Sequence, residues 1–173
     1  MCAINVCCIT NKLNYHIIQP YIHKHDFVCL SETKCDVIAE NKIQDFRSFV
    51  LKKKCKTHKY GGIHGICILV KNKFAMNCTV IHEMTSESIV WIHVTKHVIG
   101  REFILGSVYL PHEGSNHYHE EVFEFLADDI ITLNAKYETP ILLMGDFNSR
   151  TVKLNDFEED VYPCARNIDI DID

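Results

Sequence analysis

An apolar segment that ends in two polar side chains narrows the choice of fold more than any other part of the chain. A run of apolar residues follows Pro140 and leads into Gly145-Asp146-Phe147-Asn148. Such a run predicts a strand covered on both faces, and Gly145 would let its backbone approach a ligand closely. In an extended segment, Asp146 and Asn148 point to the same side. They would then emerge at the carboxyl end of the strand, where α/β proteins usually bind ligands. An Asp/Asn turn without a site is the alternative, and the segment alone does not decide between them.

Size and composition indicate one ordinary globular domain. The chain has 173 residues, of which 47% are hydrophobic and 24% charged, which suits a single domain with its own core. No apolar run approaches the roughly 20 residues of a membrane span. The first residues lack the basic start and cleavage site of a signal peptide. We therefore expect an intracellular monomer, nuclear or cytoplasmic, that is not secreted and has no membrane partner.

The nine cysteines are a high and odd number. Without a secretion signal, we expect reduced thiols rather than disulfides. The sequence has no Cys-x-x-Cys pair, so a structural zinc site is less favoured than cysteines that do not bind metal. Several cysteines lie in apolar strand patterns, where cysteine behaves as a small hydrophobic residue.

The charge pattern disfavours a protein that coats nucleic acid through bulk electrostatics, because the formal net charge is −5. Residues 52–59 nevertheless form a local basic run just before Gly61-Gly62. A solvated loop is the usual fate of such a run. The functional alternative is a loop in which Lys54, Lys56 and Lys59 contact phosphate or nucleic acid.

Hydrophobic periodicity predicts the following elements. Strands are expected over 2–9, 27–30, 46–51, 63–70, 76–82, 88–97 and 102–109, and again after Pro140. Helices are expected over 14–24 with a bend near Pro20, over 36–44, and from an N-cap at Ser115 to about Asn134.

The sequence adds three details to these predicted elements. The strands over 76–82, 88–97 and 102–109 are spaced like an antiparallel meander, and Gly65 predicts close backbone packing. One face of the helix that starts at Ser115 is expected to carry Tyr118, Val122, Phe125, Leu126, Asp129, Ile130 and Leu133. After Arg150 the pattern breaks down, which predicts a domain over 1–157 and an acidic tail, or a truncated remainder of that domain, over 158–173.

Three more polar residues lie at or near predicted strand ends. They are Asn5 on the first strand, Glu32 after the second, and Tyr109 at the end of the strand over 102–109. Each is ordinary when taken alone, because exposed polar residues are common. An α/β sandwich could bring all of them to one rim together with Asp146.

These residues, taken in order, resemble the endonuclease/exonuclease/phosphatase superfamily. The chain is most similar to its abasic-endonuclease-like branch, as found in retrotransposons without long terminal repeats. The matching segments are Asn5-Val6-Cys7, Leu30-Ser31-Glu32-Thr33-Lys34, Gly61-Gly62-Ile63, Val108-Tyr109-Leu110-Pro111 and Met144-Gly145-Asp146-Phe147-Asn148-Ser149-Arg150. The likeness runs from residue 2 to about 157, and the Gly-Asp-Phe-Asn segment is its most specific part.

The resemblance implies a two-sheet α/β sandwich of the DNase I-like kind and a Mg²⁺-dependent phosphodiesterase or phosphatase, with Mn²⁺ as a substitute metal. We favour a DNA endonuclease derived from such a mobile element, with DNA as the substrate. The resemblance implies that Glu32 is the main metal ligand and that Asn5 lies beside it. It also implies that Asp146 positions or deprotonates the attacking water, that Asn148 holds the phosphate or water, and that Tyr109 donates to the phosphate. Oxygen ligands and a substrate phosphate are what Mg²⁺ prefers.

The sequence departs from the family at its end, because the final aspartate-histidine motif has no counterpart here. The resemblance therefore predicts a fold that is incomplete at the C-terminus and an activity lowered by the loss of a phosphate-contacting histidine. Two alternatives stay open: a phosphatase acting on lipid or inositol phosphates, and a non-catalytic remnant.

Overall fold

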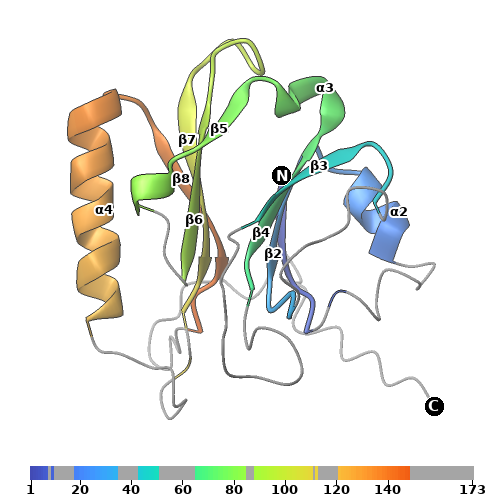
Figure 1. The fold of residues 1–173 in the computed structure, drawn as a ribbon, viewed down its shortest axis with the longest axis horizontal. Coiled ribbons are helices and arrows are strands. Elements are labelled where there is room, and N and C mark those ends of the chain that lie inside the picture. Colours follow the sequence, from blue (N-terminus) through green and yellow to red (C-terminus); the bar gives the residue numbers. More distant parts are fainter. Residues whose placement is uncertain are drawn as a thin grey trace, which may run out of the picture.

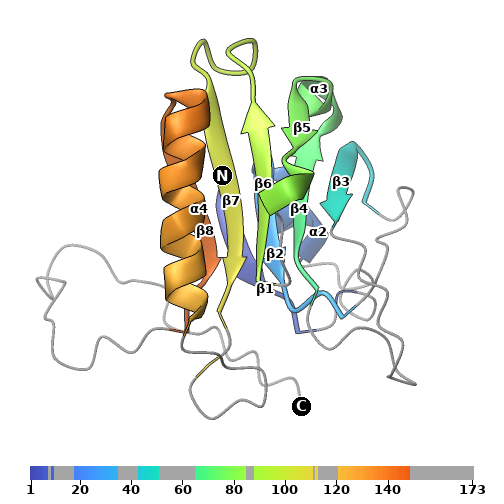
Figure 2. The ribbon, with the colours of Figure 1, turned by 60° about the vertical axis from the view of Figure 1, so that its left-hand side comes forward.

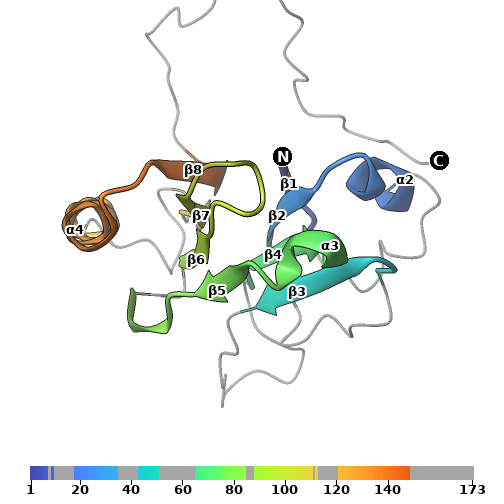
Figure 3. The same cartoon turned by 90° about the horizontal axis from the view of Figure 1, so that it is seen from above.

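Two four-stranded sheets form the centre of the protein, as a computed structural model shows (Figure 1). The structure describes residues 1–7, 9, 18–34, 43–50, 65–84, 88–110, 112 and 121–148. Seen from above, helix α4, the two sheets and helix α2 follow one another as layers (Figure 3). The expected two-sheet α/β sandwich is confirmed. The basic run over 52–59 and the expected tail over 158–173 lie outside the described residues.

The first sheet has the strand order β1-β2-β4-β3. Its strands are β1 (Cys2–Asn5), β2 (Phe27–Ser31), β4 (Cys67–Lys71) and β3 (Phe46–Val50). Strands β1 and β2 are parallel, and β4 is antiparallel to both β2 and β3. Strand β2 is buried along its whole length, as its uninterrupted apolar sequence predicts.

The second sheet has the strand order β5-β6-β7-β8. Its strands are β5 (Cys78–Val80), β6 (Ile89–Val94), β7 (Phe103–Tyr109) and β8 (Ile141–Asp146). The expected antiparallel meander is confirmed, because β5 pairs with β6 and β6 with β7 in antiparallel register. Strands β7 and β8 are parallel, and α4 (Val122–Tyr137) belongs to the crossover that a parallel pair requires.

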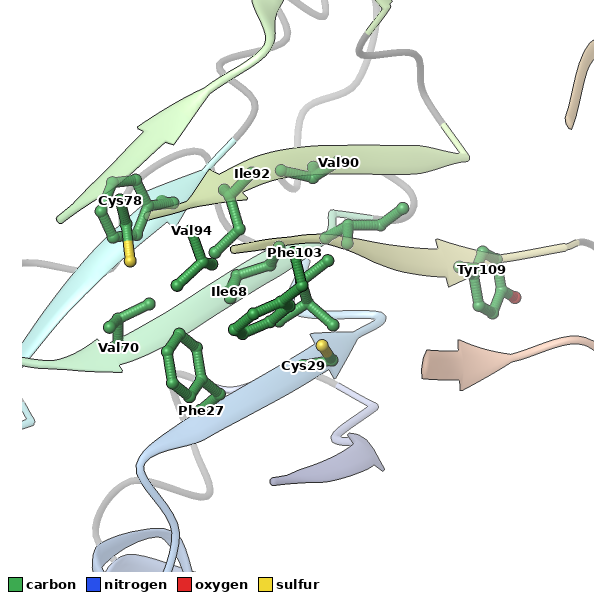
Figure 4. Close-up of a cluster of buried hydrophobic side chains, with 13 residues drawn as sticks. Phe27, Cys29, Ile68, Val70, Cys78, Val90, Ile92, Val94, Phe103 and Tyr109 are labelled. Carbon is green, nitrogen blue, oxygen red and sulfur yellow. The ribbon is translucent and has the colours of Figure 1, made fainter. Parts of the chain in front are cut away.

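Apolar side chains fill the space between the sheets and the space under α4. Between the sheets, Phe27 and Val70 of the first sheet pack against Ile92 and Phe103 of the second (Figure 4). On the outer face of the second sheet, Leu126 and Leu133 of α4 pack against a cluster that includes Trp91. The fully buried Trp91 donates its indole N–H to Asp129 Oδ2 at 2.9 Å, so α4 is attached to the sheet by apolar contacts and one hydrogen bond.

Several helix predictions differ from the structure. Helix α4 begins at Val122, later than expected, and continues past Asn134 to Tyr137; Ser115 and Tyr118 lie outside the described residues. Phe125 is 61% exposed and does not belong to the core face. It lies next to Leu126 in sequence, so the helix turns it about 100° away from the buried stripe.

Short helices are also placed differently from the predictions. Pro20 is the third residue of α2 (Ile18–His23), within the first turn, whose N–H groups need no helical acceptor. The helix expected over 36–44 falls mostly outside the described residues, and its last two positions form a turn. Two short helices, α3 (Asn72–Ala75) and η1 (His82–Met84), were not predicted; single helical turns carry too little periodicity to be recognised.

Strand boundaries and burial also differ in places. The first strand ends at Asn5 rather than at residue 9. Of the strand predicted over 63–70, residues 65 and 66 precede β4, which continues to Lys71, and residues 63 and 64 lie outside the described residues. Strand β8 is half-buried rather than covered on both faces, and its Leu142 is 42% exposed. Among the described strands β8 pairs with β7 alone, so its outer edge has less cover than a central strand.

The described cysteines carry free thiols. Cys29, Cys67 and Cys78 are buried in strands, as expected of small hydrophobic residues. Burial raises the pKa of the Cys29 thiol to about 12 and that of Cys78 to about 11. In the part of the chain that the structure describes, no helix combines the length and hydropathy needed to cross a membrane.

Candidate active site

Four strands deliver polar side chains to one edge of the sandwich. Asn5 ends β1, Glu32 follows β2, Tyr109 ends β7 and Asp146 ends β8. Because β1 runs parallel to β2 and β7 to β8, the carboxyl ends of each pair share an edge (Figures 1 and 2). The structure therefore brings together four of the five residues to which the sequence assigned catalytic or metal-binding roles, and the fifth, Asn148, lies two residues beyond β8.

The side-chain amide of Asn5 joins the two carboxylates. Its Nδ2 donates to Glu32 Oε1 and to Asp146 Oδ2, both at 2.9 Å. Its Oδ1 accepts the backbone N–H of Cys7 at 3.1 Å. With carboxylates on one side and an N–H on the other, the amide has one favourable orientation. Glu32 and Asp146 thus lie close enough to share one ligand, although they come from different sheets.

Tyr109 adds a neutral donor to the same place. Its hydroxyl donates to Glu32 Oε1 at 3.1 Å. Burial, together with the Glu32 and Asp146 carboxylates, raises the pKa of the Tyr109 phenol to about 12. Tyr109 therefore keeps its proton at physiological pH and can donate it to a negatively charged oxygen.

Asp146 and Asn148 form a turn rather than an extended pair. Asn148 has a left-handed backbone with φ of 45°, and its backbone N–H donates to Asp146 Oδ1 at 3.0 Å. Its Nδ2 donates to the Leu110 carbonyl at 2.7 Å. The expected side-by-side projection of residues i and i+2 is therefore wrong, because the strand ends at Asp146. The Asp/Asn turn and the cluster of polar residues coexist, instead of being alternatives.

Lys34 is a member of the cluster that the sequence reasoning missed. Its Nζ lies 3.8 Å from Glu32 Oε2 and 3.5 Å from Cys7 Sγ. The available signal was its place two residues after Glu32, directly after a buried strand. That spacing alone could equally have described a solvated loop.

Rarely populated backbone conformations are concentrated at this site. Six non-glycine residues in the described part of the chain have positive φ, and four of them belong to the cluster. These four are Cys7 (37°), Glu32 (52°), Lys34 (50°) and Asn148 (45°). Such conformations cost of order 1–3 kcal/mol each and persist where the surroundings enforce them. Their concentration here is typical of a functional site.

Two glycines allow the backbone contacts behind the site. A Cβ on Gly65 would lie 2.3 Å from Thr33 Oγ1, and the Gly65 carbonyl accepts the Thr33 N–H at 3.0 Å. Close packing at Gly65 was expected and is confirmed. A Cβ on Gly145, whose φ is 146°, would lie 1.9 Å from the Val108 carbonyl oxygen. Gly145 thus allows a close approach to the neighbouring strand.

The donor set suits a hard divalent cation. Glu32 and Asp146 supply carboxylate oxygens next to an amide. Among the described residues, no three His, Cys, Asp or Glu side chains gather as a full protein cage. Mg²⁺ is usually bound by one or two carboxylates together with waters and substrate phosphates. The carboxylates of Glu32 and Asp146 therefore fit Mg²⁺. Lys54, Lys56 and Lys59 lie outside the described residues.

The chain is similar in sequence to one protein family and in fold to several solved structures. A sequence model described as the Endonuclease/Exonuclease/phosphatase family matches residues 3–156. The AP endonuclease LMAP from Leishmania major has a TM-score of 0.63 and 15% sequence identity, over 83% of this chain and 53% of that protein. No curated protein matches the chain in sequence.

Two further structures share the fold. The endonuclease domain of TRAS1, a telomere-specific non-LTR retrotransposon, has a TM-score of 0.56 and 16% identity, over 87% of this chain and 59% of that domain. The human Nocturnin catalytic domain with bound sulfate has a TM-score of 0.54 and 13% identity, over 85% of this chain and 62% of that domain. The chain thus spans between 53% and 62% of the length of these three structures.

Proposed function

The chain belongs to the endonuclease/exonuclease/phosphatase family, and from that premise we propose that it is a metal-dependent phosphodiesterase that cuts DNA. The observation that supports this proposal is the shared amide contact of Glu32 and Asp146 through Asn5 Nδ2. We further propose that the domain derives from a non-LTR retrotransposon. The fold of the TRAS1 endonuclease domain supports this origin.

Each side chain of the site has a chemical role in this proposal. Glu32 would hold Mg²⁺, or Mn²⁺ in its place, and Asn5, whose Oδ1 accepts the Cys7 N–H, would position that carboxylate through its Nδ2 donor. The metal, when bound, would neutralise negative charge on the phosphoryl oxygens. Asp146 orients the attacking water and accepts its proton, while Tyr109 donates its hydroxyl proton in a hydrogen bond to a phosphate oxygen. Asn148 holds the turn that sets the position of Asp146.

DNA is the proposed substrate class for two reasons. Two of the structures that share the fold are an AP endonuclease and a retrotransposon endonuclease. The third binds a sulfate anion, whose charge and shape resemble a phosphate.

Nicking of supercoiled plasmid with and without Mg²⁺ tests the proposal. The purified chain should convert supercoiled plasmid to the open-circular form only when the metal is present. Glu32→Gln and Asp146→Asn should each lower the rate by roughly 10²–10⁴. Glu83→Gln is the matched control, because Glu83 is a carboxylate on the surface helix η1, in an ion pair with Lys136.

Three outcomes would contradict this assignment. Equal cleavage by the wild type, Glu32→Gln and Asp146→Asn would remove these residues from the chemistry. Phosphate release from inositol phosphates without cleavage of DNA would indicate a phosphatase of the same family. No cleavage at all, together with a thermal melt that Mg²⁺ does not shift, would indicate a non-catalytic remnant.

A further inference from the structure

Lys34 places a positive charge beside the Glu32 carboxylate, which shares the Asn5 amide with Asp146, and the proposed function gives this lysine no role. Its Nζ lies 3.8 Å from Glu32 Oε2, which is beyond hydrogen-bond distance. The ammonium donates instead to Cys7 Sγ at 3.5 Å, and a thiol is a weak acceptor. The contact with Glu32 is thus a loose ion pair rather than a closed one.

The backbone around Lys34 is held in place on both sides. Thr33 is fully buried, its N–H donates to the Gly65 carbonyl, and its own carbonyl accepts the N–H of Ile9, both at 3.0 Å. Glu32 and Lys34 flank this anchored residue in left-handed conformations. Lys34 therefore starts from a fixed point at the rim of the site, unlike a lysine on a surface helix.

The Lys34 ammonium keeps the capacity to bind another anion. Its side chain is 38% exposed. Within the described residues, Nζ contacts only the Cys7 thiol and the Glu32 carboxylate, and it has three N–H donors. Lys73 offers a comparison, because its Nζ lies 3.4 Å from Asp26 Oδ1 at the other end of the first sheet.

The net charge of the metal-loaded site indicates which kind of ligand the Lys34 ammonium would bind. The two carboxylates carry two negative charges, which a divalent cation alone would cancel. Lys34 would then leave the metal-loaded site with one net positive charge, and a phosphodiester carries one negative charge. A nearby ammonium that is not fully paired attracts such a group most strongly.

We propose that Lys34 contacts a phosphate oxygen of the DNA strand at this site. The inference rests on the proposed function and deepens it by assigning a substrate contact. The contact adds DNA affinity, whereas Asp146 and Tyr109 act on the reacting groups. Loss of the lysine charge therefore weakens DNA binding more than it slows the chemical step.

A binding experiment tests this contact separately from cleavage. A short fluorescein-labelled DNA duplex is titrated with the full chain in Mg²⁺, in an Asp146→Asn background that leaves the DNA intact, and anisotropy gives Kd at several salt concentrations. Lys34→Met and Lys34→Gln should raise Kd roughly tenfold or more. They should also reduce the slope of log K against log salt by about 0.9, the value for one duplex phosphate contact.

Two control variants separate a specific contact from general charge. Lys34→Arg keeps the positive charge and should retain most of the affinity and the salt slope. Lys73→Met removes an ion-paired lysine from the opposite end of the sheet and should behave like the Asp146→Asn parent. Thermal melts of every variant confirm that each one is folded, and Lys34→Gln serves if Lys34→Met is not.

The outcomes distinguish this inference from the proposed function. An unchanged Kd and salt slope in both neutral variants overturn the contact, even if Glu32→Gln abolishes plasmid nicking. An equal loss of affinity in Lys73→Met also overturns it, because the effect is then bulk charge. If the wild type shows no metal-dependent nicking, the proposed function fails, while the binding series still shows whether Lys34 contacts phosphate.

Discussion

The Tyr109 hydroxyl donates to Glu32 Oε1 at 3.1 Å, across the interface between the two sheets. Tyr109 ends β7 of the second sheet, and Glu32 follows β2 of the first. Tyr109 also stands at the end of the apolar cluster that joins the sheets (Figure 4). The site is therefore held in register by the same packing that forms the core.

Tyr109→Phe tests the donor role of the hydroxyl. The phenylalanine ring keeps the apolar contacts but removes the O–H, and loss of one donor to a developing negative charge costs roughly 10²-fold in rate. We expect that loss in the rate of single-turnover cleavage. The melting temperature should fall only slightly, because the loss of one hydrogen bond costs about 1 kcal/mol of stability. A fully active variant would remove Tyr109 from the mechanism.

The stability of the protein at alkaline pH should depend on Tyr109. Its pKa is about 12 in the folded chain, above the ordinary value of about 10. The folded state thus holds this proton more tightly than the unfolded state. The resulting stability is fully present below about pH 10 and is lost as the pH rises toward 12. Urea unfolding between pH 8 and 11 should show a steeper alkaline loss for the wild type than for Tyr109→Phe; parallel curves would contradict the shift.

Asp129 provides a prediction on stability. Burial raises the pKa of the Asp129 carboxyl, although its hydrogen bond from Trp91 opposes the rise. Asp129→Ala leaves the buried indole N–H without an acceptor and should cost about 1–3 kcal/mol of unfolding free energy. Asp128→Ala, at an exposed position of the same helix, should cost much less.

The isosteric variant Asp129→Asn should not lower the free energy of unfolding as Asp129→Ala does. Its amide oxygen can still accept the Trp91 N–H, and the penalty for burying a charge disappears. Above the raised pKa of Asp129 the variant should be at least as stable as the wild type, and this advantage should vanish as the pH falls through that pKa. Chemical unfolding followed by Trp91 fluorescence measures both effects.

Gly145→Ala should disrupt the sheet next to the site. The added Cβ would lie 1.9 Å from the Val108 carbonyl oxygen, at a φ of 146°, so the β7–β8 pair must separate. We expect a loss of more than about 3 kcal/mol or an unfolded protein. Gly100→Ala is the control, because φ is 76° there but no atom lies within 4 Å of the added Cβ. Backbone strain at Gly100 should cost roughly 1 kcal/mol of unfolding free energy. If Gly145→Ala costs no more than that, the predicted clash with Val108 is wrong.

Metal binding should be visible without catalysis. A ligand that binds only the folded state raises its stability by RT ln(1 + [L]/Kd), so Mg²⁺ should raise the melting temperature in proportion to the logarithm of its concentration. Glu32→Gln should abolish this shift, and Glu83→Gln should preserve it. An identical shift in all three proteins would place the bound metal elsewhere.

The amino-acid order alone indicates the family, most strands, and which polar residues lie at strand ends. Strands β2 and β6 are recognisable because their apolar runs are too short for a helix and are rich in β-branched and aromatic residues. Asn5, Glu32, Tyr109 and Asp146 could be singled out because each is a polar residue at or near the end of a predicted strand. Local pattern carries this information, since each signal spans only a few residues.

Contacts between distant segments could be learned from the folded chain alone. The Asn5 amide bridge, the Tyr109–Glu32 hydrogen bond, the contact of Lys34 with Cys7 and the exposure of Leu142 all depend on which strands become neighbours. The sequence of a strand indicates that one face is apolar, but it does not indicate which surface covers that face. The packing of the two sheets determines the covering surface, because the free energy of burial is shared between segments that are far apart in the chain.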